Sequence, residues 1–416
     1  MRIRPDHPAT PRQAARRAAR WLHSAPWGQC EFNWHPLPEP VEGDPRYIAV
    51  DGGNALIETE TATFYLVKAW AGRFNPLDRE ARLASVNMVR LQKWISERVS
   101  TYREILEAAV AYKVMGDDGA DLILMDGSPE PVMRWWAAST TRLYHGHGLN
   151  KAREVLRSVA GLIGSTLGVE CSEECIDDLI RDGGLRPSSA YAVSLVPDSL
   201  LDSGGGMWVR DLETLERLYA YKTLFEEAWR QGARVVYVTK TVRKSELCDR
   251  MLSDTHYIRL REPSRPGYTY WGGSLRIGAP EIVGILEPME PAKDERLEEM
   301  YPNYLGVRSF YTSRVAVLGF YARLSPWSPV LYIAEVLPAR EALEIRMAGR
   351  SMLEERINGL LSLLLSLPGS RVPGSGYPAG LVRAHMEAHV TEDDKRGVEA
   401  VLRLDAQRPN RSMLVE

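Results

Sequence analysis

Short runs of apolar residues alternate with longer stretches of helical periodicity along this chain. Strands are predicted where β-branched and aliphatic residues follow one another, and helices where apolar residues recur at spacings of three and four. Strand-helix-strand alternation of this kind is typical of an α/β core with a sheet flanked by helices. The predicted strands are RYIAV at 46–50, DLILM at 121–125, RVVYVTK at 234–240, SRVAVLGFYARL at 313–324 and VLYIAEVL at 330–337, with helices at about 79–114 and 211–231 between the first three.

The remaining segments complete the predicted organisation. NALIETE and TATFYLVKAWAG, which follow residue 53, are predicted to be further strands joined by a turn. Residues 131–215 are predicted to be a mainly helical insertion, and helices are predicted at about 339–367 and 381–404. We therefore expect a basic arm and connector over residues 1–45 and one α/β domain over residues 46–410.

The composition is that of a globular protein with almost balanced charge. Its 416 residues include 52 Lys and Arg against 55 Asp and Glu, a net charge of −3. Near neutrality excludes a uniformly basic nucleic-acid binder, although it leaves room for a local basic channel. Residues 1–22 carry six arginines against one aspartate, so this arm is either a solvated tail or a contact for DNA or a protein partner.

Two further features bear on the environment of the protein. The longest apolar stretch, residues 359–367, is far shorter than the ~20 residues that a membrane span needs. The N-terminus has no apolar signal core, and we expect a cytoplasmic protein without a membrane partner. Asn and Gln together number 13, a scarcity of thermolabile amides that hints at a thermophile.

Two of the predicted strands end in an Asp-Gly pair, at Asp51-Gly52 and Asp126-Gly127. Ligands of open α/β sheets bind at the carboxyl ends of the strands, so two aspartates there can share divalent cations. Hard oxygen ligands suit Mg²⁺ or Mn²⁺. A single Asp-Gly is more often only a turn, and the matched pair leaves both a metal site and turn chemistry open.

Other side chains are candidates to join the two aspartates. Glu104 and Glu107 lie three positions apart on the predicted 79–114 helix and share a face, so either is a candidate third acid. Lys240 ends a predicted strand, where it can neutralise a phosphate or position water, and Arg243 and Lys244 add a basic cluster that can contact DNA. His385 lies on the last predicted helix in HMEAH, which lacks the His-Glu-x-x-His order of metalloproteases.

Seven motifs follow one another along the chain: AVDGG (49–53), YRE (102–104), LILMDGS (122–128), VVYVTKT (235–241), LSD (252–254), FYARL (320–324) and GYPAGLVRAH (376–385). Their order resembles the archaeal NurA nuclease family. The resemblance covers roughly residues 46–400, and it implies a ribonuclease H-like mixed sheet, a homodimer that encloses a channel for DNA, Mn²⁺-dependent cleavage with Mg²⁺ as the alternative, and a hexameric HerA-type ATPase as partner. It also implies 5'-3' exonuclease and single-strand endonuclease activity in DNA end resection and recombinational repair.

Carried over position by position, the resemblance implies a role for each candidate. Asp51 and Asp126 would bind metal with Glu104, or its rival Glu107, and with His385. Lys240 would contact phosphate or water, and Tyr377 and His385 would complete the catalytic set. Carboxylate-bound metals can activate water for attack on one side of a phosphodiester and stabilise the leaving oxygen on the other.

Two other functions remain open from the sequence. A sugar-kinase or actin-like phosphotransferase also begins with a strand that ends in Asp-x-Gly, but the chain lacks a glycine-rich adenosine-binding loop late in its sequence. A non-catalytic DNA-binding subunit would keep the fold and lose the acids, whereas this chain retains both aspartates.

Overall fold

The computed structural model describes residues 32–59, 62–88, 95–117, 119–129, 206–241, 245–247, 253–277 and 310–402. The arginine-rich arm at 1–22, the predicted insertion up to residue 205, and the pair Arg243 and Lys244 lie outside the described residues.

Within this part of the chain, the strands form one mixed nine-stranded sheet in the order β3-β2-β1-β4-β5-β9-β8-β6, with β7 also paired to β8. Strands β1, β4 and β5 are parallel, and every other pairing is antiparallel. The fold is therefore a mixed sheet of an α/β protein, as predicted. The strands are β1 (Tyr47–Glu58), β2 (Thr63–Phe74), β3 (Arg79–Met88), β4 (Leu122–Asp126), β5 (Arg234–Thr239), β6 (Gly267–Thr269), β7 (Leu275–Ile277), β8 (Val315–Arg323) and β9 (Leu331–Pro338).

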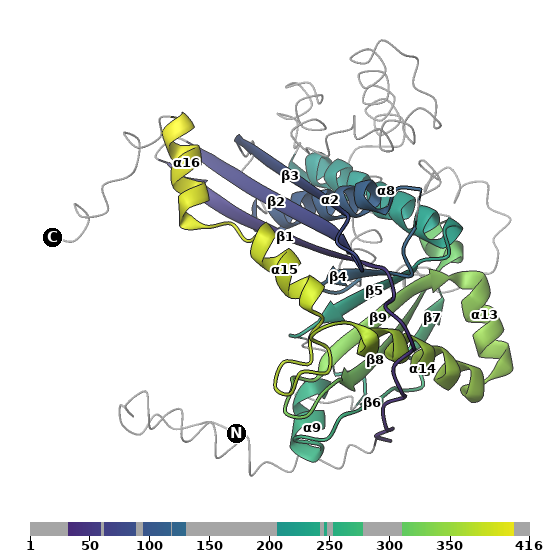
Figure 1. The fold of residues 1–416 in the computed structure, drawn as a ribbon. Coiled ribbons are helices and arrows are strands. Elements are labelled where there is room, and N and C mark those ends of the chain that lie inside the picture. The colour runs from purple at the N-terminus through teal and green to yellow at the C-terminus, as the bar shows by residue number, and fades with distance from the viewer. Residues whose placement is uncertain are drawn as a thin grey trace, which may run out of the picture.

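Helices cover both faces of the sheet (Figure 1). Alternate residues of each strand point to opposite faces, and the central strands are apolar on both, as expected for strands buried between two layers of helix. On one face, Ile48 and Val50 pack with α2 (Ile95–Met115) and α8 (Gly206–Arg230). On the other, Tyr47 and Ala49 pack in the core that includes α13 (Ala339–Ala348), α14 (Arg350–Ser366) and α15 (Ala379–Ala388).

The prediction of one helix from 79 to 114 was wrong in its first part. Residues 79–88 form edge strand β3, paired with β2 from Arg73↔Arg79 to Phe64↔Met88, and the helix begins at Ile95. In this segment Ala81 and Leu83 alternate with the more exposed Arg82 and Ala84, a period of two that fits a strand. The segment is compatible with the periodicity of a helix and with that of a strand. It forms a strand because β2 offers backbone hydrogen bonds along its edge.

The expectation that the first strand ends at Asp51 was also wrong. Only its parallel pairing with β4 ends there, after Val50↔Met125, while β1 continues to Glu58 as half of a long hairpin with β2. NALIE is therefore the second half of β1 rather than a new strand. Gly127, after β4, does turn the chain, with φ of 112°.

Gly52 and Gly53 lie within β1 and allow helices to approach this strand closely, rather than forming a turn. A Cβ on Gly52 would lie 2.4 Å from Glu107 Oε1 of α2, and a Cβ on Gly53 would lie 2.2 Å from the Ala388 carbonyl oxygen at the end of α15. Successive strand residues face opposite sides, so the glycine pair lets one helix approach β1 from each face.

The C-terminal helical segments are each divided in two. Gly349, with φ of 82°, separates α13 from α14, and residues 389–391 separate α15 from α16 (Glu392–Leu402). The short helix α9 (Asp254–Arg261) and a π-helical turn at Phe310–Arg314 complete the described elements. None of the described helices combines the length and the apolar composition that a membrane span needs.

Candidate metal centre

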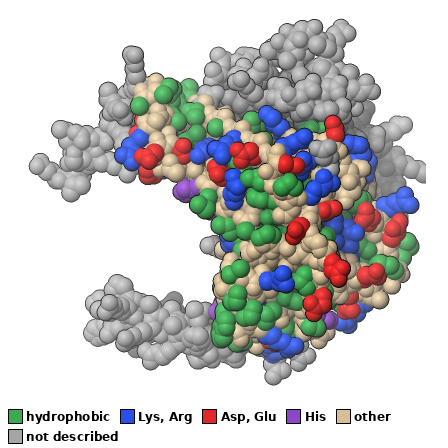
Figure 2. Space-filling view, viewed as in Figure 1, with side chains coloured by type: hydrophobic (Ala, Val, Ile, Leu, Met, Phe, Trp, Pro, Cys, Tyr) green, Lys and Arg blue, Asp and Glu red, His purple; other side chains and the backbone are tan. Residues whose placement is uncertain are grey.

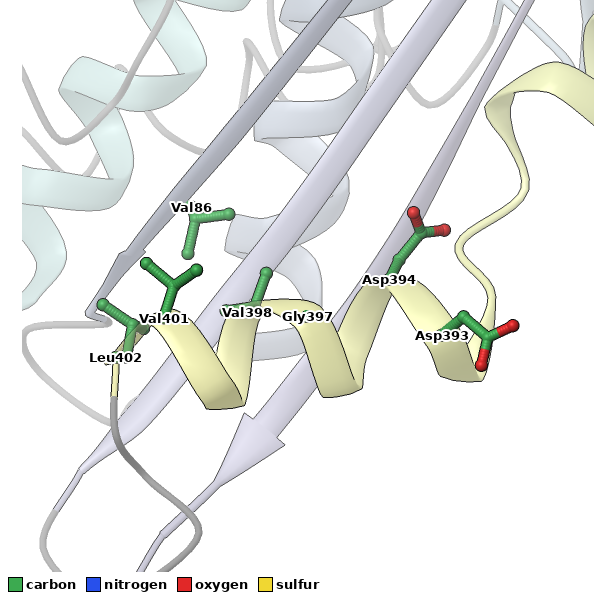
Figure 3. A pocket seen from close by; sticks show the side chains of 7 residues that line it. All are labelled: Val86, Asp393, Asp394, Gly397, Val398, Val401 and Leu402. Carbon is green, nitrogen blue, oxygen red and sulfur yellow. The ribbon is translucent and has the colours of Figure 1, made fainter.

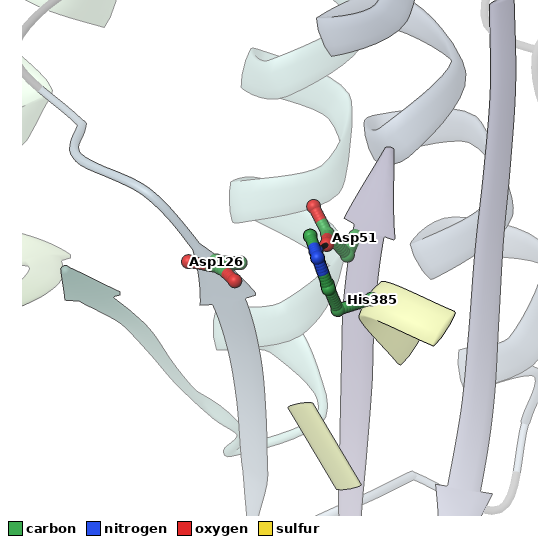
Figure 4. A group of neighbouring side chains, drawn as sticks. All are labelled: Asp51, Asp126 and His385. Atoms are coloured by element: carbon green, nitrogen blue, oxygen red, sulfur yellow. Dashed lines mark hydrogen bonds and ion pairs between the residues drawn. The ribbon is translucent and has the colours of Figure 1, made fainter. Parts of the chain in front are cut away.

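Two carboxylates lie together where the parallel strands β1 and β4 stop pairing. Asp51 follows the last parallel pair, Val50↔Met125, and Asp126 is the last residue of β4. Both have the strand parity of the residues that pack against α15, so their side chains emerge on the same face of the sheet (Figure 4). Asp51 is 7% exposed and Asp126 is partly buried. This is the edge at which α/β sheets hold ligands.

His385 of α15 completes the group. Its Nδ1 lies 2.8 Å from Asp51 Oδ2 and donates to that carboxylate in the tautomer that such a bond requires. Asp51 Oδ1 also accepts a hydrogen bond from the Gly52 backbone N–H at 2.7 Å. Asp51, Asp126 and His385 each offer one ligand atom, and these atoms all lie within 4.8 Å of one another. His385 and Asp51 are 334 residues apart in the sequence, and they meet because α15 packs across β1.

The electrostatics of Asp126 show how closely the charges are gathered. Burial raises the pKa of Asp126, and repulsion from Asp51 raises it further. Lys240, a hydrogen bond from the Tyr377 hydroxyl, and His385 act in the opposite direction. The folded chain thus holds two acids together against their repulsion and lines the site with donors that favour the charged forms.

Lys240 and Tyr377 meet beside Asp126, although they come from distant parts of the chain. Lys240 follows β5, and its Nζ lies 3.6 Å from the centre of the Tyr377 ring. The Tyr377 hydroxyl lies 3.4 Å from the Val238 carbonyl oxygen. Burial, followed by the nearby Asp126, raises the pKa of Tyr377, so this hydroxyl stays protonated as a donor.

Of the two rival glutamates, Glu107 lies closer to the aspartates. Its carboxylate fills the space beside Gly52, from the face opposite to the Asp51 side chain, and it is 5% exposed. Burial raises the pKa of Glu107 to about 8; Arg103 opposes this shift, and Asp51 adds to it. Glu104 instead accepts from Arg217 Nη1 at 2.8 Å. Neither glutamate belongs to the group whose ligand atoms lie within 4.8 Å.

The sequence reasoning missed Arg103, which forms ion pairs with both glutamates. Its Nε is 3.3 Å from Glu107 Oε1, and its side chain packs against the position a Gly52 Cβ would take. The i, i+4 spacing of Arg103 and Glu107 was the available signal. His389, the other histidine of HMEAH, has its ring centre 6.0 Å from that of His385, with the two rings tilted by 40°, and lies outside the acidic group.

A separate groove lies between α16 and the edge strand β3, away from the acidic group (Figure 3). It holds none of the predicted site residues. Its lining is Val86, Asp393, Asp394, Gly397, Val398, Val401 and Leu402.

A mixed α/β sheet with two aspartates and a histidine gathered at the end of its parallel strands defines an α/β protein with a candidate cation site. Comparison with known proteins identifies the family. The NurA domain model matches residues 45–390, and the chain belongs to the NurA family.

Solved structures of the family share this fold. The NurA nuclease of Sulfolobus solfataricus is 18% identical, with a TM-score of 0.56 over 94% of this chain and 92% of that one. A NurA structure with manganese is 16% identical, with a TM-score of 0.52 over 96% and 98%. A NurA structure bound to dAMP and manganese is 16% identical, with a TM-score of 0.51 over 96% and 94%. No curated protein matches the chain.

Proposed function

We propose that this chain is a metal-dependent DNA nuclease that hydrolyses phosphodiester bonds at the site formed by Asp51, Asp126 and His385. The observation that carries the proposal is the meeting of their ligand atoms within 4.8 Å at the end of the parallel strands. The family includes a structure with dAMP and manganese bound, a nucleotide together with a divalent metal, which supports the same assignment.

The donor set fits a hard divalent cation. Asp51 and Asp126 would hold Mn²⁺, or alternatively Mg²⁺, through carboxylate oxygens, and His385 would offer a ring nitrogen, a combination that Mn²⁺ accepts. Repulsion from Asp51 adds to the effect of burial in raising the pKa of Asp126. A bound cation would neutralise the negative charge that causes this repulsion. When bound, the metal supplies a water of lowered pKa and stabilises the leaving oxygen.

The surrounding residues have separate roles. Lys240, held over the Tyr377 ring, would neutralise a non-bridging phosphate oxygen. The hydrogen bond from the Tyr377 hydroxyl favours the charged form of Asp126 and would hold its carboxylate in position. His385 donates to Asp51 through Nδ1, which leaves Nε2 of this exposed ring either to bind the cation or to exchange a proton with the substrate.

We infer that Glu107, rather than Glu104, is the third acid. Glu107 fills the gap that Gly52 leaves beside Asp51, and the charges of Asp51 and Asp126 both act on it, whereas Glu104 accepts from Arg217. We also propose that β1 to β5 form a ribonuclease H-like core within a single nuclease domain over residues 46–410. The order β3-β2-β1-β4-β5, in which an antiparallel meander precedes two parallel strands, supports this reading.

The finer activities and partners of the family are proposed for this chain as well. They are 5'-3' exonuclease and single-strand endonuclease cleavage in end resection and recombinational repair, a homodimer, and a HerA-type ATPase partner. Family membership supports them. Arg243 and Lys244 follow Lys240 in sequence and are proposed to extend its contact with DNA.

Cleavage by an Asp51→Asn variant tests the proposed function. Purified wild type and variant are incubated with end-labelled linear DNA and Mn²⁺. We expect at least a hundredfold loss of cleavage, since the amide cannot replace the anionic ligand. A Glu392→Gln variant on α16 is the control and should cleave normally. The proposal fails if Asp51→Asn cleaves at the wild-type rate. ATP hydrolysis without nuclease activity would instead favour the kinase-like alternative.

A further inference from the structure

One aromatic side chain near the metal centre is exposed in a way that packing does not explain. Trp327, in the turn between β8 and β9, has 73% of its surface exposed. Its backbone has φ of 63°, in the left-handed region where a residue with a Cβ is strained. A glycine would occupy this position without strain, so the fold itself has no need of a tryptophan here.

The turn that carries Trp327 is rigidly anchored on both sides. Ser325 and Ser328 flank it and are only 1% and 4% exposed. The Ser328 hydroxyl donates to the Ser325 carbonyl at 2.8 Å, and Arg323 Nε donates to the Ser328 carbonyl at 3.0 Å. The indole is therefore held out from the surface on a fixed base, which lowers the entropy that it would lose on binding a ligand.

This turn packs directly against the loop that ends at the metal centre. Ser325 Oγ donates to the Val372 carbonyl at 2.7 Å, and the Gly374 N–H donates to the Pro326 carbonyl at 2.8 Å. Gly376 approaches Ser328 so closely that a Cβ there would lie 2.4 Å from the Ser328 Cβ. The next residue is Tyr377, which hydrogen-bonds Asp126. Trp327 precedes Ser328 and Tyr377 follows Gly376, and consecutive Cα atoms are ~3.8 Å apart. The Cα atoms of Trp327 and Tyr377 therefore lie within about 13 Å of each other.

The surroundings of the indole suit a nucleic-acid strand. The neighbouring loop, which is hydrogen-bonded to this turn, exposes a cation and an apolar side chain, Arg371 and Val372. Figure 2 shows that this face of the molecule is hollowed on the side where the loop from α14 to α15 and the carboxyl ends of β4 and β5 lie (Figure 1). An unpaired base presents an open ring face, which a base within a duplex does not.

We propose that Trp327 is a stacking platform for an unpaired nucleobase of the DNA strand whose phosphodiester lies at the metal centre. The proposal rests on the proposed nuclease function and adds the residue that would hold the strand where it is single. Stacking on an exposed aromatic ring tolerates any base, so Trp327 would hold the strand without reading its sequence.

Binding of labelled oligonucleotides by the full chain, without divalent metal, tests the proposal. We expect Trp327→Ala to weaken single-strand binding about tenfold and Trp327→Phe to retain most of it, because the ring is kept. Met347→Ala removes a similarly exposed apolar side chain, 79% exposed on α13, and should change nothing. Binding to a blunt duplex should not depend on Trp327.

Abasic substitutions locate the contact. When each base of the oligonucleotide is removed in turn, wild type should lose affinity at one or two adjacent positions, and Trp327→Ala should lose none there. Equal affinity of wild type and Trp327→Ala, or the same abasic pattern in both, overturns the proposal. If wild type binds and cleaves DNA in those cases, the proposed function stands; if wild type neither binds nor cleaves, that function has failed too.

A stability measurement separates a stacking role from a structural one. Trp327→Gly relieves the left-handed strain, so its thermal midpoint should equal or exceed that of wild type, while its single-strand binding falls as in Trp327→Ala. A midpoint lowered by several degrees would assign Trp327 to the fold and contradict the proposal.

Discussion

At the scale of single residues, the candidate site depends on how each acid is compensated. Asp51 accepts from the Gly52 N–H and His385, and Asp126 lies beside Lys240 and Tyr377. Glu107 is more deeply buried and has Arg103 as its closest cation, at 3.3 Å. Burial therefore outweighs compensation at Glu107, and its pKa rises to about 8.

The pKa of Glu107 predicts a pH-dependent stability of the metal-free protein. The folded chain binds this proton more tightly than the unfolded chain, whose glutamate has its ordinary pKa of 4.5. Stability from Glu107 is thus full below pH 4.5 and is lost as pH rises through 8. Glu107→Gln removes this loss, so the variant should gain stability relative to wild type between pH 5 and 8, by about 3 to 4 kcal/mol.

Chemical unfolding of wild type and Glu107→Gln at pH 5, 6.5 and 8 measures this difference. The exposed Glu392→Gln serves as the matched control and should show no comparable trend. A constant difference between wild type and Glu107→Gln across the three pH values would contradict the assigned pKa.

At the scale of elements, the site depends on how closely two helices approach β1. Gly52 admits the Glu107 carboxylate of α2, and Gly53 admits the end of α15 on the other face. Gly380 of α15 lies against Tyr47 of β1 in the same way, since a Cβ there would lie 2.5 Å from the ring. The position of His385 relative to Asp51 is therefore set by backbone contacts between β1 and α15.

Gly53→Ala should displace α15 and disrupt the site. The added Cβ would lie 2.2 Å from the Ala388 carbonyl oxygen, a backbone atom that cannot rotate away. We expect the free energy of unfolding to fall by about 1 to 3 kcal/mol. Mn²⁺ affinity should fall by a larger fraction of its wild-type value than stability does, because His385 moves with the helix. Gly397→Ala, where a Cβ meets open space, is the control. Wild-type Mn²⁺ affinity in Gly53→Ala, measured by calorimetry, would show that α15 placement does not matter.

At the scale of the whole molecule, the site joins segments that are far apart in sequence. Its residues come from β1, β4, β5 and α15, and buried ion pairs join other distant parts, such as Arg98 of α2 with Glu213 of α8 at 2.7 Å. A ligand that binds Asp51, Asp126 and His385 together is linked to the folding of the chain as a whole, because the unfolded chain cannot bring them together.

Mn²⁺ should therefore stabilise the whole protein. At a concentration one hundred times its dissociation constant, the metal adds about 2.7 kcal/mol, which should appear as a higher thermal midpoint. An Asp51→Asn/Asp126→Asn double variant should lose this response. Without metal, the same variant should be more stable than wild type, because the burial of charge and the repulsion from Asp51 that raise the pKa of Asp126 are both removed. An equal response to Mn²⁺ in both proteins would contradict the metal site.

Much of the architecture could be read from local patterns. The strands at 122–126, 234–239, 315–323 and 331–338 were predicted because buried strands are apolar on both faces, and this signal does not depend on the partner. The strand at 79–88 was missed because an edge strand carries a mixed pattern, and only pairing with β2 distinguishes it from a helix. The break between α13 and α14 was marked in the sequence by Gly349, whose backbone is left-handed.

The site divides in the same way. Residue type and position after a buried apolar run were enough to single out Asp51, Asp126 and Lys240 as candidates, since such runs form neighbouring parallel strands whose paired segments end at the same edge. The choice between Glu104 and Glu107 was not available from helix periodicity, because both share a face. It depends on which turn of α2 lies over Gly52, and hence on the docking of α2. The proximity of Trp327 to the site likewise comes only from the packing of two loops, which are joined by hydrogen bonds between residues 47 and 48 positions apart. Chemistry and secondary structure follow from local sequence, whereas distances between remote side chains follow from how the helices and loops pack on the sheet.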